Sequence, residues 1–272
     1  MNTDRQGTGM LWLMLVGVLL TLAPLRVVAQ QYTGMSGLIH VPSADMDDAG
    51  EARIGVHFLN KKFTPNMGFL FEGEKYNTLC HYLSITPFSW LEVGYTCTLQ
   101  KARPINNDWV ELDGKPRLRG KDRYFSIKLQ PLKEGKWWPA IAVGSNDPYS
   151  TGNPRGTIYE GLSSGDDSGK PQYFSNFYVA ATKHFDLKGH KLGLHLAYRY
   201  WRRTYNRKWN GPVGGITYQP SFQQNLRLIV EYTGDDVNVG IDWKLWKHLL
   251  LQASLQNGKY FTGGLAFCLN LL

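Results

Sequence analysis

The alternation of residues in Leu192–Trp201 constrains the fold more than any other feature of the sequence. Leucine and tyrosine occupy one set of alternate positions, and small or polar residues occupy the other. Because side chains alternate across a β-strand, this stretch has one apolar face and one small or polar face. The apolar face ends in two tyrosines, and Arg202 and Arg203 follow at once, an order typical of a strand that crosses lipid. A soluble periplasmic β-sandwich would also alternate, but it requires polar outer faces, which these are not.

The same alternation recurs along the chain and predicts about twelve strands. The connections also alternate, because the long polar loops follow odd-numbered strands and the short, aromatic-flanked turns follow even-numbered strands. An even strand number with short turns on one side is typical of bacterial outer-membrane barrels. We therefore predict an all-β, transmembrane, antiparallel up-and-down barrel with both termini periplasmic. The predicted strands are 51–59, 76–85, 90–99, 121–130, 137–145, 172–184, 192–201, 211–219, 225–232, 236–244, 248–256 and 259–270.

The N-terminal region predicts export. An apolar run from Met10 to Pro24 is too short for a spanning helix, which needs about 20 residues, and has the length of a signal-peptide core. Small residues before Gln30 place the cleavage after Ala29, so residues 1–29 are a predicted signal peptide. Residues 30–50 form an irregular lead-in, either periplasmic or inside the barrel, and residues 51–272 form the barrel. The predicted location is the outer membrane of a Gram-negative bacterium.

The inward face of the predicted barrel carries charges of both signs. One interpretation is a network of ion pairs that fills and stiffens the lumen. The other is a constriction that selects a charged or sugar-like solute. The sequence alone does not decide between these two interpretations. The predicted lumen-lining residues are Glu92, Lys128, Arg199, Arg227, Glu231 and Asp242, with Lys244 beside them.

The chain is basic, with a formal net charge of +8. For an exported protein this charge favours anionic lipopolysaccharide or acidic glycan as a partner and makes nucleic acid a poor one. Four basic residues that follow the strand Leu192–Trp201 would lie on the cell exterior. They are either a solvated surface or a contact for lipopolysaccharide phosphates. They are Arg202, Arg203, Arg207 and Lys208.

Nothing in the sequence predicts catalysis, a cofactor or a metal. His184, His195 and His248 are candidate bases, but there is no Gly-x-Ser-x-Gly motif and no serine partner on the strand of His195. The acidic stretch Ser163–Gly169 lacks the spacing of a calcium loop. The three cysteines, Cys80, Cys97 and Cys268, lack metal-site spacing, and a disulfide between the first two stays open.

Several motifs resemble the YjbH-like outer-membrane proteins. The opening Gly-Leu-Ile-His-Val-Pro-Ser-Ala of Gly37–Ala44 is similar to the start of that family, and Leu91–Tyr95 is similar to its Leu-Glu-Val-Gly strand. Pro139–Gly144 and Gly234–Gly240 resemble its central and late blocks. The resemblance implies an outer-membrane barrel associated with exopolysaccharide or capsule production, and it transfers no catalytic residue. This chain has room for one barrel, whereas long members of the family are much longer.

The leading functional hypothesis is export or surface assembly of a polysaccharide, together with periplasmic or outer-membrane export partners. The alternative is a narrow passive channel for small charged or sugar-like solutes. A third hypothesis, an outer-membrane enzyme, would need a serine–histidine pair near the lipid-side rim. No such pair is visible in the sequence, and we expect the protein not to be an enzyme.

Overall fold

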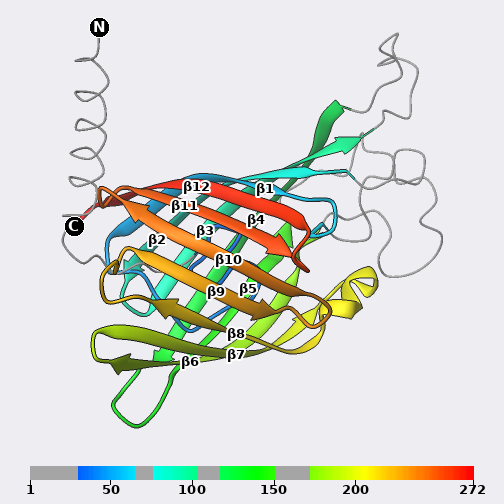
Figure 1. The fold of residues 1–272 in the computed structure, drawn as a ribbon. Helices are drawn as coiled ribbons and strands as arrows, with labels where there is room; N and C mark the ends of the chain where they lie inside the picture. Colours follow the sequence, from blue (N-terminus) through cyan, green and yellow to red (C-terminus); the bar gives the residue numbers. More distant parts are fainter. Residues whose placement is uncertain (1–29, 65–75, 103–116, 151–171) are drawn as a thin grey trace, which may run out of the picture.

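The computed structural model describes residues 30–64, 76–102, 117–150 and 172–272. The predicted signal peptide 1–29 and the acidic stretch 163–169 lie outside these residues. The described chain forms twelve strands and one short 3₁₀ helix (Figure 1). None of its helices has the length and apolar character needed to cross a membrane. The elements are β1 Glu51–Leu59, β2 Thr78–Phe88, β3 Leu91–Ala102, β4 Arg117–Leu132, β5 Ala140–Ser150, β6 Asn176–Leu187, β7 His190–Trp201, η2 Thr204–Trp209, β8 Gly211–Gln219, β9 Leu226–Tyr232, β10 Val237–Leu245, β11 Leu249–Gln256 and β12 Tyr260–Asn270.

The strands close into a single barrel. Each strand pairs antiparallel with the next one in the chain, and β1 pairs with β12, with Glu51 opposite Asn270. Closure leaves no unpaired sheet edge, which is the condition for a β-structure to span lipid. The predicted up-and-down barrel of about twelve strands is therefore confirmed. The start of β1 and the end of β12 meet at the end of the barrel where the short turns lie.

Several strand limits differ from the predicted ones. Strands β3 and β4 extend into the predicted polar loop, because their backbones stay paired as far as Ala102 opposite Arg117. Strand β5 begins at Ala140 and β6 at Asn176, each a few residues later than predicted. The helix η2, which carries Arg207 and Lys208, lies where no helix was predicted.

The outer surface of the barrel is apolar. Leu196 in the middle of β7 is 69% exposed, whereas its neighbours His195 and Ala197 are buried, and the same alternation repeats around the barrel. Large aliphatic side chains that face outward in water would be unfavourable, but in a bilayer they contact lipid tails. The predicted lipid-facing and inward-facing positions of β7 are confirmed.

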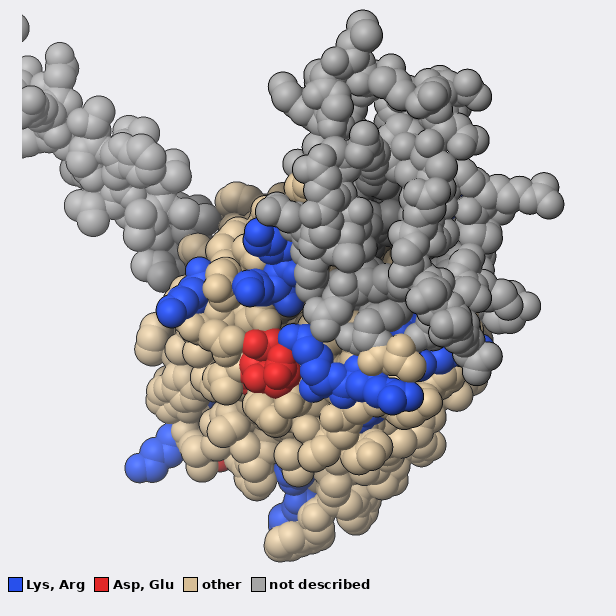
Figure 2. Space-filling model, turned by 90° about the vertical axis from the view of Figure 1, so that its right-hand side faces the viewer, with Lys and Arg blue, Asp and Glu red and all other residues tan. Residues whose placement is uncertain are grey.

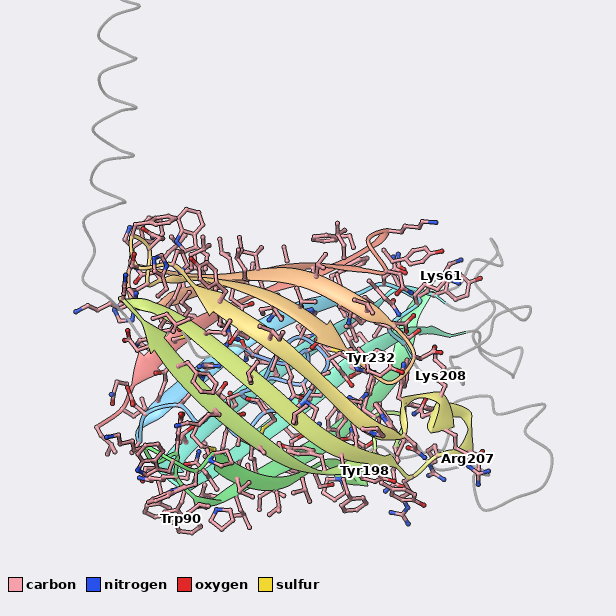
Figure 3. The ribbon with its side chains drawn as sticks, turned by 60° about the horizontal axis from the view of Figure 1, so that its bottom comes forward. Lys61, Trp90, Tyr198, Arg207, Lys208 and Tyr232 are labelled. Atoms are coloured by element: carbon pink, nitrogen blue, oxygen red, sulfur yellow. The ribbon has the colours of Figure 1, made fainter. Side chains whose placement is uncertain are left out.

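Aromatic residues mark the two edges of this apolar belt. Figure 3 shows Trp90 at the short-turn end, while Tyr198 and Tyr232 lie toward the opposite end, near Arg207 and Lys208. Such girdles place amphipathic rings at the level of the lipid headgroups. The large exposed aromatic residues at the short turns are Phe88, Trp90, Trp137, Trp138, Phe185, Phe222 and Trp246.

The lead-in lies inside the barrel, which settles the choice between a periplasmic and an internal position. We call residues Gln30–Gly50 the plug; its first fifteen residues, through Ala44, are all buried. Inward-facing glycines of the wall make room for its apolar side chains. A methyl group at Gly94, Gly215 or Gly240 would overlap Met35, Leu38 or Ile39, respectively. The small inward residues of these strands thus accommodate the plug.

Candidate lumen site

Glu231 of β9 holds one turn of the plug. Its Oε2 accepts hydrogen bonds from the backbone N–H groups of Ile39, His40 and Val41, at 3.0–3.1 Å. Its Oε1 accepts from the His40 N–H at 2.9 Å and from the Asn238 amide at 2.7 Å. Hydrogen bonds to a charged acceptor are stronger than those between neutral groups. One carboxylate therefore fixes three successive peptide groups of the plug.

Arg199 of β7 holds the same turn from its carbonyl side. Its guanidinium donates to the His40 carbonyl at 2.8 Å and to the Thr233 carbonyl at 2.9 Å. The guanidinium lies over the Trp201 ring, 5.1 Å from its centroid. The His40 ring packs against Trp201 and Trp209, so aromatic contacts surround this charged contact.

Glu92 and Lys128 hold a second point of the plug, at Ser36. The Glu92 carboxylate accepts from the Ser36 N–H at 2.7 Å and from the Ser36 hydroxyl. Lys128 Nζ donates to the Ser36 carbonyl at 2.8 Å and lies 3.2 Å from Glu92 Oε2. Neither charged side chain is exposed to any extent. A fully buried ion pair needs hydrogen bonds of this kind to offset the desolvation of both charges.

Arg227 and Asp242 form a third attachment. Arg227 donates to Asp242 at 2.8 Å and to the Gly37 carbonyl at 3.2 Å. Gln252 links the other carboxylate oxygen of Asp242 to the plug, because it donates to both Asp242 and the Gln30 carbonyl at 2.8 Å. The plug is therefore bonded to strands on several sides of the barrel.

The predicted lumen residues are thus brought together by the plug. All six are inward and buried, and all except Asp242 bond directly to plug atoms. In these attachments the wall supplies the charges and the plug supplies mainly backbone N–H and C=O groups. Sequence reasoning left the position of the lead-in open and did not identify it as the partner of these charges, because a side-chain contact to a backbone group leaves no residue pattern. The inward glycines of the wall were the available signal.

The four predicted rim residues do not share one environment. Arg202, Arg207 and Lys208 are exposed, and Lys208 pairs with Asp235 at 2.6 Å. Arg203 is buried and donates to the Gln172 side chain at 3.0 Å, so it departs from the expected exterior position. Its side chain lies inward beyond the end of β7, where the alternation of a strand no longer applies and the contact with Gln172 holds it. Figure 2 shows Lys and Arg side chains around this end of the barrel.

The candidate catalytic bases have mainly structural partners. His248 Nδ1 lies 3.0 Å from the Cys268 carbonyl. His184 and His195 lie near Asp45 of the plug, at 3.6 and 3.7 Å. His190, which the sequence did not single out, has Ser221 Oγ at 3.3 Å from one ring nitrogen and the Tyr218 hydroxyl at 2.8 Å from the other. No catalytic function is shown by these contacts.

The cysteines are free thiols in the structure. Cys80 stands opposite Thr98, and Cys97 stands opposite His81, so the two cysteines are one register position apart. Cys80 points inward and Cys97 outward. Because their side chains lie on opposite faces of the sheet, the hairpin disulfide that the sequence left open does not form.

The closed barrel, its apolar belt and its aromatic girdles define an integral β-barrel protein of the Gram-negative outer membrane. Residues 29–158 match the family model YjbH, described as exopolysaccharide biosynthesis protein YbjH. The matched stretch includes the plug and β1 to β5. This stretch is YjbH-like, as the motifs predicted. Fold and match together support a role in the cell envelope and in exopolysaccharide-related processes.

Known proteins add little further. A comparison with curated proteins gives no significant match. Among solved structures, outer membrane phospholipase A from Escherichia coli is similar, with 13% identity and a TM-score of 0.35 over 81% of this chain and 95% of that chain. A Rh. blastica porin has 9% identity and a TM-score of 0.29 over 82% of this chain and 75% of that chain. Likeness at this level transfers no activity to this chain.

Proposed function

We propose that this barrel serves in the export or surface assembly of an exopolysaccharide or capsular polysaccharide, with residues 30–50 acting as a displaceable plug. Two observations support the proposal. The YjbH match covers the plug and the strands that follow it. Polar contacts with charged wall residues hold the plug in the lumen. These contacts can be exchanged for others, unlike a disulfide cross-link to the wall or a continuous β-ladder.

The chemistry of the lumen suits a polyhydroxylated chain. When the plug moves aside, Glu92, Arg199, Glu231 and their neighbours become free to bond to another ligand. Sugar hydroxyl groups both donate and accept hydrogen bonds, so they can replace the backbone N–H and C=O groups of the plug. A lumen of twelve strands is narrow, which favours passage of a single extended chain.

We infer that both termini face the periplasm. The start of β1 and the end of β12 lie at the short-turn end, and short turns are periplasmic in outer-membrane barrels. Periplasmic export partners would then approach the plug from this end. The opposite end, with η2, would face the cell exterior.

The exposed basic residues at the exterior end are proposed to contact lipopolysaccharide phosphates. Arg207 and Lys208 lie with Lys61 at this end in Figure 3. We expect a double Arg202→Gln and Arg207→Gln variant to retain less lipopolysaccharide on purification than the wild type. A matched pair at the opposite end, Lys136→Gln with Lys247→Gln, should retain as much as the wild type.

A disulfide that locks the plug tests the export role. Thr96 of β3 donates to the Thr33 carbonyl of the plug at 2.7 Å, so the two residues are neighbours. The test variant is Thr33→Cys with Thr96→Cys in a chain whose native cysteines are serine, and the mass of the oxidised chain shows whether the bond has formed. We expect the oxidised barrel to abolish surface carbohydrate export and a reductant to restore it. Each single variant is the control.

The result against the proposal would be normal surface carbohydrate in cells whose barrels are shown by mass to be locked. Unchanged carbohydrate after deletion of the protein would also count against it. A passive channel makes a different prediction, because it needs a standing water path. Steady conductance of the wild-type barrel in a planar bilayer would favour that channel, whereas we expect the docked plug to prevent it.

A further inference from the structure

Three side chains from separate parts of the chain meet at the short-turn end of the lumen. Asp45 of the plug faces His184 of β6 and His195 of β7. His184 Nε2 lies 3.6 Å from Asp45 Oδ1, and His195 Nδ1 lies 3.7 Å from Asp45 Oδ2. One donor atom from each residue lies within 4.8 Å of the others.

These spacings fit ligands of one metal ion better than hydrogen-bonded partners. Both separations exceed the range of a hydrogen bond between nitrogen and oxygen. Two ligands that each lie about 2.0–2.1 Å from a tetrahedral zinc ion are separated by roughly 3.4 Å. A small adjustment of side chains would bring the three groups to that geometry.

Groups behind the two imidazoles orient them toward Asp45. Glu134 Oε2 lies 2.8 Å from His184 Nδ1, so that nitrogen donates to the carboxylate and Nε2 presents its lone pair to the cluster. A carboxylate behind a histidine is a common outer partner in zinc sites.

His195 is oriented in a similar way. Its Nε2 lies 2.9 Å from the Thr217 hydroxyl, and its Nδ1 lies 3.1 Å from the Thr182 hydroxyl. The Thr182 oxygen also accepts the Ala44 N–H at 2.9 Å. In the tautomer whose Nε2–H donates to Thr217, Nδ1 is unprotonated, and a metal ion takes its lone pair in place of the Thr182 hydroxyl.

We propose that Asp45, His184 and His195 bind a divalent transition-metal ion, zinc best of all. Two imidazoles with one carboxylate are a common donor set for zinc sites that keep a position open to water or substrate. A cleft of about 420 Å³, lined in part by Asp45, Glu134 and His184, gives access to the cluster. Arg227, 4.0 Å from Asp45, is neutralised by its closer partner Asp242. The bound ion joins the plug to two strands of the wall.

Zinc titration of the refolded barrel, untagged and treated with a chelator, tests this site. We expect one zinc ion per chain by calorimetry and a higher melting temperature with zinc. Asp45→Asn and His184→Gln should each weaken binding more than tenfold, and Glu134→Gln about tenfold to a hundredfold. His248→Gln, at the same end but outside the cluster, is the control and should bind zinc as the wild type does.

Binding of cobalt in place of zinc provides an independent readout. The visible absorption of bound cobalt should show nitrogen and oxygen ligands and should disappear in Asp45→Asn, whose barrel fold is checked by circular dichroism. The proposal is overturned if a folded wild-type barrel takes up no zinc at micromolar free metal. It is overturned equally if folded Asp45→Asn and His184→Gln barrels bind zinc as tightly as the wild type.

Discussion

Replacing Glu231 by glutamine should loosen the plug without disturbing the barrel wall. The substitution keeps the size of the side chain and removes its charge. In the wild type, the two carboxylate oxygens accept three backbone N–H groups of the plug and the amide of Asn238. In the variant, one carbonyl oxygen remains for the three N–H groups, and Asn238 can turn to face the new amide.

The magnitude follows from the number of charged hydrogen bonds that become neutral. A bond to a charged group contributes about 1.5–3 kcal/mol and a neutral one about 0.5–1.5 kcal/mol, so three bonds lose roughly 3 kcal/mol. The amide costs less to bury than the carboxylate, which offsets part of this loss. We expect plug docking to weaken by about 2 kcal/mol, which lowers the docked-to-undocked ratio roughly thirtyfold.

Thiol labelling measures this ratio. Ser43 is fully buried in the plug, so Ser43→Cys in a chain without native cysteines reacts with a water-soluble maleimide only when the plug undocks. We expect Glu231→Gln to react about thirtyfold faster. Asp235→Asn, which removes an exposed carboxylate paired with Lys208, should react at the wild-type rate. Equal rates for folded Glu231→Gln and wild-type barrels would refute the reasoning.

Two substitutions and one labelling experiment test other parts of the structure. Lys128→Met leaves the buried Glu92 carboxylate without its ion-pair partner and should cost about 3–5 kcal/mol in equilibrium unfolding, whereas adding Glu92→Gln should recover part of it. Leu196→Arg places a charge on the lipid face and should cost about 2–4 kcal/mol when unfolding is measured in lipid vesicles. Alkylation of the unfolded wild type without reductant should modify all three cysteines, and a mass that shows a bond between Cys80 and Cys97 would contradict the observed register.

The fold could be predicted from the sequence because most strands follow one local rule, the alternation of outward apolar and inward small or polar residues. In β7, leucines and tyrosines face lipid while His195 and Arg199 face inward, and the period of two alone assigns both faces. The strand limits were less predictable. Backbone pairing between β3 and β4 continues through polar residues, where the apolar signal has ended.

The sequence predicted which charged residues face the lumen but not which groups they contact. Parity along the strands places Glu92, Arg199 and Glu231 on the inner face, but it does not show what they touch. Their partners are peptide groups of Ser36 and His40, and any residue type offers the same N–H and C=O groups. Arg203 shows the other limit, because parity ends with the strand, and its inward position depends on the segment around Gln172.

The plug and the wall form one electrostatic unit, and this bears on how the barrel can open. The lumen acids Glu92, Glu231 and Asp242 each meet plug N–H groups, a basic neighbour or both, as in the pair Glu92 and Lys128. If the plug leaves, the pairs within the wall remain, but Glu231 loses three backbone donors and keeps only Asn238 among its described partners. An incoming ligand that displaces water from this carboxylate must supply replacement donors, because a buried carboxylate without them is costly. Hydroxyl groups of a glycan meet this requirement, whereas an apolar chain does not.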